Sequence, residues 1–589
     1  MAHGDTGRGR GLTLGPVALA ALGMVGVQFV VRLLIVPQSF WWEDDFFHLA
    51  QARTEGLRPD FLVSDYNDHL EILPNFLWWL LTRVTDSSWA PAAVLILLLS
   101  LAASSAMFAL LHELFGPRPA VLVPFAAYLF SPLGLVPVTW LAAGIDALPM
   151  QVALLGTAWA MVRLQRTGQR RWWAAAVALH VLGLLAWEKG ALVLPFVLGL
   201  QLLVLDAGRP VRERLAALRR QWPVWLSHVV VLAVFTVVYL QVVDGSERRD
   251  VTGADYVGAA RTTLFRVLVP GLFGAPWKRG DALNTLYPDP GPVLAVVFAL
   301  LLGVLVVLSF LRTGRRAAGP WLLAAAYVGA DIGLMLWGRA GFLSLVARDP
   351  RYVSDAVPVV LVCATAAFLG VPTRARAAVA DSRSALAPAG AVAAVVSVGS
   401  LLTTFQLAPV LEHRYARDYV TGVLVRAEAD PGSSILDTPV PKLVSGNVDH
   451  RGLVWAMGRR VTFNQPSTRM LVFDEASRLV PVAIVDATLT QKGPVSDCGW
   501  PVAAQRRLIA RVPAHAGPDR VLRVGNLTGV AGTLTVDVGG LEQSVAVDAG
   551  LSVAWFHLPH PSGDIVASFE AKDGSGTCVT DLVLGTPGR

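Results

Sequence analysis

The sequence is short of charged residues. Only 16% of its 589 residues are Asp, Glu, Lys or Arg, whereas a soluble chain carries about 25%. The deficit is uneven, because apolar runs alternate with short polar loops from Leu12 to about Val410, and a soluble-like sequence begins at Glu412. This pattern excludes a wholly soluble chain and predicts a transmembrane body over residues 1–410 and a separate domain over residues 411–589.

A signal-peptide cleavage site is also lacking. Residues 1–10 are polar and basic, and the apolar run behind them is not followed by a small-x-small motif. The run is about 25 residues long, too long for the core of a signal peptide. We therefore expect a retained first span.

Cysteine is scarce, with three residues in the whole chain. Cys363 lies in an apolar run, as expected for a small buried side chain. Cys498 and Cys578 both lie in the C-terminal domain, where an oxidising compartment would allow a disulfide between them. Two free buried thiols are the alternative.

The formal net charge of +6 does not indicate nucleic-acid binding. The basic residues cluster in short loops between apolar runs, where they act as topology signals. We therefore expect no nucleic-acid partner.

A helix needs about 20 apolar residues to cross a bilayer, and by that measure the sequence contains about eleven spans. They run roughly over residues 12–36, 89–113, 119–138, 146–163, 172–188, 190–206, 223–243, 291–312, 320–338, 354–371 and 387–409. The basic loops all fall on one face of this arrangement, the face of the N-terminus. Their arginines are Arg8, Arg10, Arg118, Arg163, Arg166, Arg170, Arg171, Arg209, Arg212, Arg214, Arg219, Arg220, Arg312, Arg315, Arg316, Arg374, Arg376 and Arg383.

The positive-inside rule therefore predicts a multi-pass plasma-membrane protein with a cytoplasmic N-terminus and an extracytoplasmic C-terminal domain. The longer loops 37–88, 244–290 and 339–353 then lie outside. In the C-terminal domain, apolar and polar residues alternate over short stretches such as 520–524, 533–538 and 543–547, separated by Gly, Pro, Asn and Asp. This favours a β-sandwich, serving either as a carbohydrate-binding module or as a structural lid.

An acidic motif follows the first span. Residues 41–48 read Trp-Trp-Glu-Asp-Asp-Phe-Phe-His, which places Glu43, Asp44 and Asp45 side by side between aromatic pairs. Carboxylates this close suit a general base or a cation site. The alternative is a solvated helix cap beside an interfacial aromatic belt.

The same outer loop carries a second polar cluster, in which Asp68 and His69 precede the apolar stretch with Trp78 and Trp79. We interpret it as a polar pocket under an amphipathic segment. Metal binding stays open, although the spacing matches no dedicated His/carboxylate signature.

Further charged residues are expected at the outer membrane boundary. Asp146 lies in a short loop, and Glu188 and Lys189 end another span. Charges at this depth are costly and usually face a functional cavity, although Glu188 and Lys189 could also satisfy each other. Arg348, Arg351 and Tyr352 form a basic cluster on the face that should lack one. They suit an anionic headgroup or phosphate, with interfacial snorkelling as the alternative.

The order of these motifs over residues 12–370 resembles the GT-C superfamily of integral-membrane glycosyltransferases. The resemblance rests on the acidic motif, a His-Leu-x-x-Leu-Pro-like segment from His69, a Trp–Gly–acid loop ending at Asp146, a Trp-Glu-Lys segment before a Leu-Pro helix, and an Arg-Tyr pair at 351–352. It implies a polyprenyl-phosphate-linked sugar donor that enters from the membrane lipid. It also implies an acceptor hydroxyl on a cell-envelope glycan, glycolipid or glycoprotein.

In that family an acid after the first span is the general base, which implies Asp44 first and Asp45 next, with another acid orienting the acceptor or holding a cation. Arg348, Arg351 or Lys189 would stabilise the leaving phosphate. The residues Asp44 or Asp45, His69, Asp146 and Arg351 should then surround one outward-opening cavity. The Ala-, Arg-, Gly- and Val-rich composition resembles actinobacterial sequences, which suggests a decaprenyl-phosphate pentose or mannose. A divalent cation is the one cofactor left open.

Two other functions compete with this interpretation. A transporter or flippase of lipid-linked saccharides would carry paired inverted repeats, and the sequence shows no convincing internal repeat. A non-catalytic anchor for a β-sandwich binding domain would lack polar clusters in the first outer loop, which contains two.

Overall fold

The computed structural model describes residues 15–245, 251–276, 289–371, 383–429 and 434–588. The chain divides into two compact units. The helical unit consists of Met1–Trp41 and Thr54–His413, and the C-terminal unit consists of Trp42–Arg53 and Arg414–Arg589. The division after His413 lies close to the domain boundary expected at residue 410. The short segment Trp42–Arg53, expected in an outer loop of the membrane body, belongs to the C-terminal unit.

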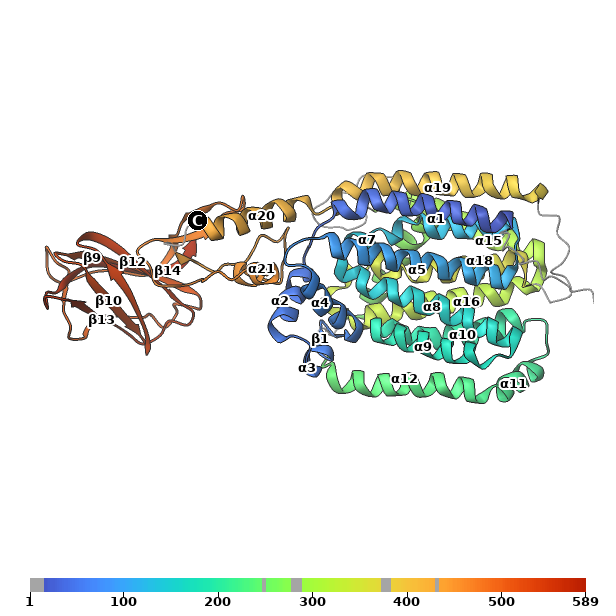
Figure 1. The fold of residues 1–589 in the computed structure, drawn as a ribbon, viewed down its shortest axis with the longest axis horizontal. Helices are drawn as coiled ribbons and strands as arrows, with labels where there is room; N and C mark the ends of the chain where they lie inside the picture. The colour runs from blue at the N-terminus through green and yellow to red at the C-terminus, as the bar shows by residue number, and fades with distance from the viewer. Residues whose placement is uncertain (1–14, 246–250, 277–288, 372–382, 430–433, 589) are drawn as a thin grey trace, which may run out of the picture. The chain divides into compact units, whose positions relative to one another are not determined.

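The helical unit is a bundle of long apolar helices (Figure 1). Its main helices are α1 (Pro16–Ile35), α4 (Ile72–Val84), α5 (Ala90–Phe115), α6 (Leu122–Leu129), α7 (Val136–Thr139), α8 (Leu141–Thr167), α9 (Arg170–Ala186), α10 (Val193–Gly199), α11 (Val211–Arg220), α12 (Trp222–Val242), α13 (Gly253–Thr262), α15 (Pro292–Thr313), α16 (Ala318–Gly338), α18 (Ala356–Leu369) and α19 (Arg383–Leu411). Helix α8 packs against α5 and α9 and is the most buried. Helices α12 and α15 expose apolar side chains such as Val234 and Leu300, as expected for helices that face lipid.

The described residues contain eight helices long and apolar enough to cross a membrane, or nine if the bent pair Pro119–Leu129 and Pro132–Thr139 forms one span. This confirms a polytopic helical membrane protein, and the helices that meet this criterion number fewer than the eleven predicted spans. Part of the difference is that Pro292–Gly338 forms one apolar run of 47 residues. At about 1.5 Å per residue it would measure about 70 Å, more than twice the ~30 Å hydrocarbon core. The chain turns at Gly314, where φ is +61°, so α15 and α16 are separate helices. Helix α9 has only 17 residues.

Three of the arginines expected on the cytoplasmic face lie near one another in the helical unit. The Arg163 and Arg166 guanidinium groups lie 3.2 and 3.1 Å from the Glu113 carboxylate. Arg118, five residues beyond Glu113, donates a hydrogen bond to the Leu369 carbonyl oxygen at the end of α18. The ends of α5, α8 and α18 are thus joined at one end of the bundle, as the positive-inside pattern requires.

The C-terminal unit begins with a small mixed α/β layer. It contains α20 (Arg414–Ala429), α21 (His450–Ala456) and a sheet of β3 (Ser434–Ile435), β4 (Met470–Phe473) and β5 (Leu479–Pro481). Strand β3 runs parallel to β4, and β5 is antiparallel to β4. The segment Trp42–Arg53, which contains most of α2 (Asp44–Glu55), packs in this layer through the loop before α21.

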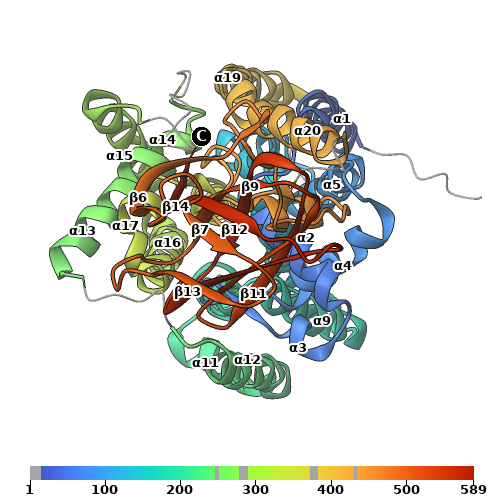
Figure 2. The same ribbon diagram turned by 90° about the vertical axis from the view of Figure 1, so that its left-hand side faces the viewer.

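The rest of the C-terminal unit is a sandwich of two antiparallel sheets, which confirms the predicted β domain. One sheet has the order β11-β10-β13-β8, and the other has β12-β9-β14-β6 with β7 also paired to β14 (Figure 2). The strands are β6 (Ala483–Lys492), β7 (Trp500–Val502), β8 (Arg507–Arg511), β9 (Arg520–Thr528), β10 (Gly532–Val538), β11 (Leu541–Val547), β12 (Gly550–Leu558), β13 (Asp564–Ala571) and β14 (Thr577–Gly588). The three alternating stretches identified in the sequence are β9, β10 and β11.

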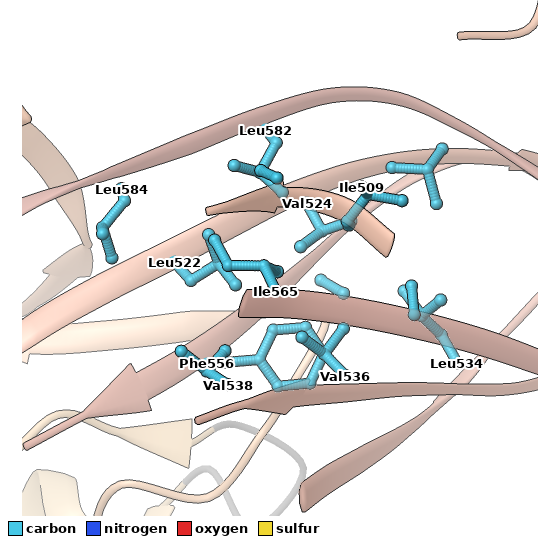
Figure 3. Packing of buried hydrophobic residues seen from close by; sticks show 14 of the residues in the cluster. Ile509, Leu522, Val524, Leu534, Val536, Val538, Phe556, Ile565, Leu582 and Leu584 are labelled. Carbon is cyan, nitrogen blue, oxygen red and sulfur yellow. The ribbon is translucent and has the colours of Figure 1, made fainter. Parts of the chain in front are cut away.

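Alternation along each strand builds the core between the two sheets. Leu522 and Val524 of β9, Leu534 and Val536 of β10 and Phe556 of β12 belong to one buried cluster, in which Phe556 lies beside Val536 (Figure 3). This is the packing of a β-sandwich. Cys498 and Cys578 form a disulfide across 80 residues of chain, with Cα atoms 4.9 Å apart. Cys363 is buried in α18.

Candidate functional site

A small polar pocket of about 30 Å³ lies in the helical unit, lined by segments far apart in the sequence. Its lining residues are Asn67, Asp68, His69, Trp187, Glu188, Lys189, Tyr239, Leu334, Met335, Trp337, Gly338, Arg339 and Tyr352. Five of the residues singled out by sequence are among them, namely Asp68, His69, Glu188, Lys189 and Tyr352. We call this site the polar pocket.

A tight hairpin brings Asp68 and His69 into the polar pocket. Strands β1 (Asp65–Tyr66) and β2 (His69–Leu70) pair across Asn67 and Asp68, whose φ angles are +51° and +62°. Positive φ at both central residues is the geometry of a two-residue hairpin, and Asn and Asp tolerate it better than most side chains. The Tyr239 hydroxyl donates to the Asp68 carbonyl oxygen at 3.0 Å, which fixes the hairpin against α12.

His69 lies between an acid and a guanidinium. Its Nδ1 lies 2.7 Å from Glu188 Oε1, and its Nε2 contacts the Arg339 guanidinium. Burial, reinforced by the positive charge of Arg339, lowers the pKa of His69 below its usual range. A neutral ring with the proton on Nδ1 fits both contacts, because Nδ1–H donates to Glu188 and Nε2 accepts from Arg339. The His69–Glu188 contact is therefore a hydrogen bond between an imidazole and a carboxylate.

Lys189 is buried among carboxylates of α16 and of the turn before α18. Its Nζ lies 2.5 Å from Asp331 Oδ1 and 3.2 Å from Asp355 Oδ1, and it donates to the Tyr352 carbonyl oxygen. The Tyr327 hydroxyl donates to the other Asp355 oxygen at 3.0 Å. Glu188 and Lys189 thus have different partners, and Lys189 ties the 3-10 turn Glu188–Leu192 to α16 and α18.

The sequence interpretation missed Arg339, Asp331 and Asp355. A lone Asp331 within an apolar run was a usable signal, because an intramembrane acid is costly unless a cation lies beside it. Arg339 directly follows a span, where an arginine is also expected simply as a boundary residue. Its sequence context therefore offered no signal for a role in the pocket.

Two glycines in the predicted motifs permit close backbone approach. A Cβ on Gly144 would lie 2.2 Å from the Pro137 carbonyl oxygen, and a Cβ on Gly190 would lie 2.5 Å from the Gly183 backbone. No Cβ atom tolerates such distances, so α7 packs on α8, and the turn after α9 packs on α9, only with glycine there. The Trp–Gly–acid motif therefore has a packing function in addition to its acid.

Arg351 packs beside the polar pocket without lining it. Its Nε lies 2.8 Å from Asp349 Oδ2, and its guanidinium lies over the Trp140 ring at 4.3 Å and donates to the Tyr352 hydroxyl at 2.9 Å. Burial raises the pKa of Asp349, against the opposing effect of Arg351. Arg348 is exposed, and Asp146 is half-buried in the first turns of α8. Neither residue lines the polar pocket.

The acidic motif belongs to the C-terminal unit, whereas the polar pocket belongs to the helical unit. Helix α2 begins at Asp44. Asp45 is fully buried and accepts a hydrogen bond from the Trp42 amide at 3.0 Å, which ties its carboxylate to the backbone just before the helix. Asp44 is half-buried, and Glu43 precedes the helix with a φ of +48°.

Three carboxylates could hold a cation. One oxygen each of Asp65, Asp68 and Asp244 lies within 4.8 Å of the others, with Asp68 buried and the other two exposed. Partial burial, with Asp244 and Asp68 close by, raises the pKa of Asp65. Carboxylate oxygens are the ligands that Mg²⁺ and Ca²⁺ prefer.

An apolar groove of about 630 Å³ opens on the helical unit. Its walls are residues of α13, the turns around Leu264 and Leu268, α15 and α16, including Ile332 and Leu336. Leu336 is three residues before Arg339 of the polar pocket. The groove and the pocket thus both lie along the C-terminal half of α16, on different faces of that helix.

No protein-family model matches this sequence, and no curated protein matches it. Two solved structures are similar to the chain. One is ArnT from Cupriavidus metallidurans in the apo state, with 16% identity and a TM-score of 0.39 over 75% of this chain and 86% of that chain. The other is the arabinosyltransferase EmbB from Mycobacterium smegmatis, with 12% identity and a TM-score of 0.37 over 99% of this chain and 66% of that chain.

Proposed function

We propose that this protein is a membrane glycosyltransferase that moves a sugar from a polyprenyl-phosphate donor to a hydroxyl acceptor outside the cytoplasm. The observation that carries the proposal is the polar pocket. Residues from the first outer loop, the Glu-Lys turn, the end of α16 and the Arg-Tyr pair meet there at the end of an apolar bundle. Polar groups gathered at the boundary of a membrane domain are costly and mark a site of function.

Arg339 supports binding of the donor phosphate. It is buried, and its guanidinium contacts the neutral His69 ring. A guanidinium binds phosphate through paired hydrogen bonds. Arg351, stacked on Trp140 nearby in the fold, is the second cation that we assign to the phosphate. The space in the pocket is water-sized, so donor binding requires the Arg339–His69 contact to open.

The apolar groove supports a lipid carrier. It lies among membrane helices, and Leu336 on its wall is about one helical turn, roughly 5 Å, from Arg339. A prenyl chain in the groove would therefore lie along the same helix that leads to Arg339. A soluble sugar nucleotide would have no use for such a groove.

The chemistry needs a base and a stabilised leaving group. We assign the base to Asp44, because Asp45 is fully buried and accepts from the Trp42 amide. The Asp44 carboxylate removes the proton of the acceptor hydroxyl, whose oxygen then forms the new bond to the anomeric carbon. The bond from that carbon to the lipid phosphate breaks, and the phosphate leaves with the electron pair, with inversion at the sugar. Arginines at the phosphate lower the barrier by stabilising this charge.

Several finer assignments are also proposals. The donor is a decaprenyl-phosphate pentose or mannose, and the acceptor is a cell-envelope glycan or lipid. The N-terminus is cytoplasmic and the C-terminal unit extracytoplasmic. If a divalent cation takes part, it binds at Asp65, Asp68 and Asp244. Chelation followed by separate re-addition of Mg²⁺, Mn²⁺ and Ca²⁺ tests that assignment.

The proposal is tested with purified protein in liposomes that contain radiolabelled polyprenyl-phosphate pentose or mannose and a cell-envelope acceptor extract. We expect Arg339→Gln to reduce transfer about 100-fold, as removal of one transition-state donor does. We expect Asp44→Asn to abolish it. Arg212→Gln, on the exposed face of α11, is the matched control and should transfer normally. Full activity of Arg339→Gln and Asp44→Asn would remove the proposal, and lipid translocation without transfer would favour a transporter.

A further inference from the structure

The residue before the acidic helix has an unusual backbone conformation. Glu43 has a φ of +48°, in the left-handed region that side chains other than glycine rarely occupy. Such a conformation persists only where the surroundings hold it in place, and it concentrates at functional sites.

A loop of the C-terminal unit holds Glu43 through its backbone and its side chain. We call residues 443–447 the clasp loop. The Glu43 amide donates to the Val444 carbonyl oxygen at 2.9 Å, and the Ser445 hydroxyl donates to the Glu43 carbonyl oxygen at 3.1 Å. The Gly446 amide donates to Glu43 Oε2 at 2.8 Å. Three hydrogen bonds on one residue account for the strained conformation.

The clasp loop also contacts the residues on both sides of Glu43. The Trp42 indole N–H donates to the Leu443 carbonyl oxygen at 3.1 Å. The Asn447 side-chain amide donates to Asp44 Oδ1 at 2.5 Å. Farther along α2, Arg53 Nε donates to the Ala456 carbonyl oxygen at 3.0 Å, which joins the helix to the end of α21. Figure 1 shows α2 next to α21.

We propose that the clasp loop is a positioning element for the catalytic acid, with Asn447 setting the orientation of the Asp44 carboxylate. The inference rests on the proposed function, in which Asp44 is the base. An amide that donates to one carboxylate oxygen restricts the rotamer of the side chain, and so the direction of the whole carboxylate. Glu43 is then a structural residue, which the clasp loop holds through hydrogen bonds.

This arrangement gives the C-terminal unit a part in catalysis. A displacement of about 1 Å in a reacting group can cost about 100-fold in rate. A base held by a loop some 400 residues later is therefore sensitive to changes in that loop. Neither a lid that only covers the membrane domain nor a module that only binds glycan would place a donor on the Asp44 carboxylate.

The test measures kcat and KM separately for Asn447 variants in the same liposome assay. We expect Asn447→Ala to lower kcat about 10- to 100-fold with little change in the KM for donor or acceptor. Asn447→Asp keeps the shape but loses the donor and adds a negative charge, so its kcat should fall further. Asn447→Gln, which keeps the amide on a longer arm, should recover part of the activity. Gln491→Ala, on an exposed position of β6, is the matched amide control.

Asp44→Asn is measured in parallel, so that failure of the positioning role of the clasp loop can be distinguished from failure of the base assignment. An inactive Asp44→Asn beside fully active Asn447→Ala and Asn447→Asp variants overturns the clasp and leaves the base assignment in place. A fully active Asp44→Asn overturns the base assignment itself. A raised acceptor KM at unchanged kcat in Asn447→Ala also overturns the clasp, because it makes Asn447 an acceptor-binding residue. Thermal unfolding of each variant shows whether the variant is folded. If Asn447→Ala does not fold, the test rests on Asn447→Asp, whose side chain has nearly the same shape as that of Asn447.

Discussion

At the scale of single residues, the protonation of His69 couples the polar pocket to pH. Its pKa is lowered by burial and by Arg339, so the folded state binds its proton less readily than the unfolded chain does. Between this lowered pKa and the ordinary value of about 6.5, the unfolded state carries more protons, and stability therefore rises with pH. Stability should level off above about pH 6.5, where both states are neutral.

We expect His69→Gln to reduce this slope, with the remainder coming from other buried histidines such as His413. Thermal unfolding of wild type and variant in detergent, measured from pH 4 to 8, checks the expectation. His560→Gln, at an exposed site of the C-terminal unit, should retain the wild-type slope. A slope that is unchanged in His69→Gln would place its origin entirely in other groups.

Lys189 allows a second residue-scale prediction. Lys189→Met leaves Asp331 and Asp355 buried without their cation, and removing one partner of a buried ion pair costs about 3–5 kcal/mol. The double variant Lys189→Met with Asp331→Asn should lose less, because one of the stranded charges is also removed. Chemical unfolding of both variants measures the difference, with Lys492→Met on exposed β6 as the control. Equal losses in the single and double variants would contradict the coupling.

At this scale, sequence reasoning identified residues but not partners. Asp68, His69, Glu188, Lys189 and Tyr352 were recognised because polar side chains at membrane boundaries are rare, and they do line one pocket. Their partners come from elements up to 270 residues away, as with His69 and Arg339. Hydropathy and charge patterns carry no information on such distant pairings.

At the scale of elements, the packing of α7 on α8 depends on Gly144. A Cβ there would lie 2.2 Å from the Pro137 carbonyl oxygen, and forced overpacking costs about 1–3 kcal/mol. We expect Gly144→Ala to destabilise the helical unit by about that amount. Gly303→Ala in α15, where no atom lies within 4 Å of the added Cβ, should instead stabilise its helix by up to about 1 kcal/mol.

Unfolding monitored by tryptophan fluorescence compares the two glycine variants. The two substitutions should change the free energy of unfolding in opposite directions. This difference is informative because both add the same methyl group to a helix. A stabilised Gly144→Ala would mean that α7 can move away without loss. Long apolar runs allowed these helices to be predicted, and each of the eleven predicted stretches overlaps a helical segment, whereas the breaks between helices depend on turns such as that at Gly314.

At the scale of the whole molecule, the disulfide and the core stabilise the β-sandwich. The Cys498–Cys578 bond closes a loop of 80 residues, and loss of such a bond costs about 2–5 kcal/mol. We expect Cys498→Ala with Cys578→Ala to lower the unfolding temperature of the C-terminal unit and to leave that of the helical unit unchanged. Limited proteolysis during heating distinguishes the two units. A parallel loss in both units would contradict this assignment.

The two-part organisation could be predicted because composition changes sharply near residue 410 and strand alternation begins beyond it. The membership of Trp42–Arg53 in the C-terminal unit could not. That segment reads as the start of an outer loop, and several of its partners are backbone groups of the clasp loop, which any sequence can offer. Contacts made by peptide groups leave no mark in side-chain patterns.

The distance between the acidic motif and the clasp loop has a consequence for biosynthesis. Glu43 and Gly446 are 403 residues apart, and at about 5–20 residues per second a ribosome needs roughly 20–80 s to make the chain between them. The apolar helices enter the membrane during that interval, while the residues around Glu43 still lack the peptide groups that hold them. The protein therefore acquires its acidic centre late in its own synthesis, after the helices are in place.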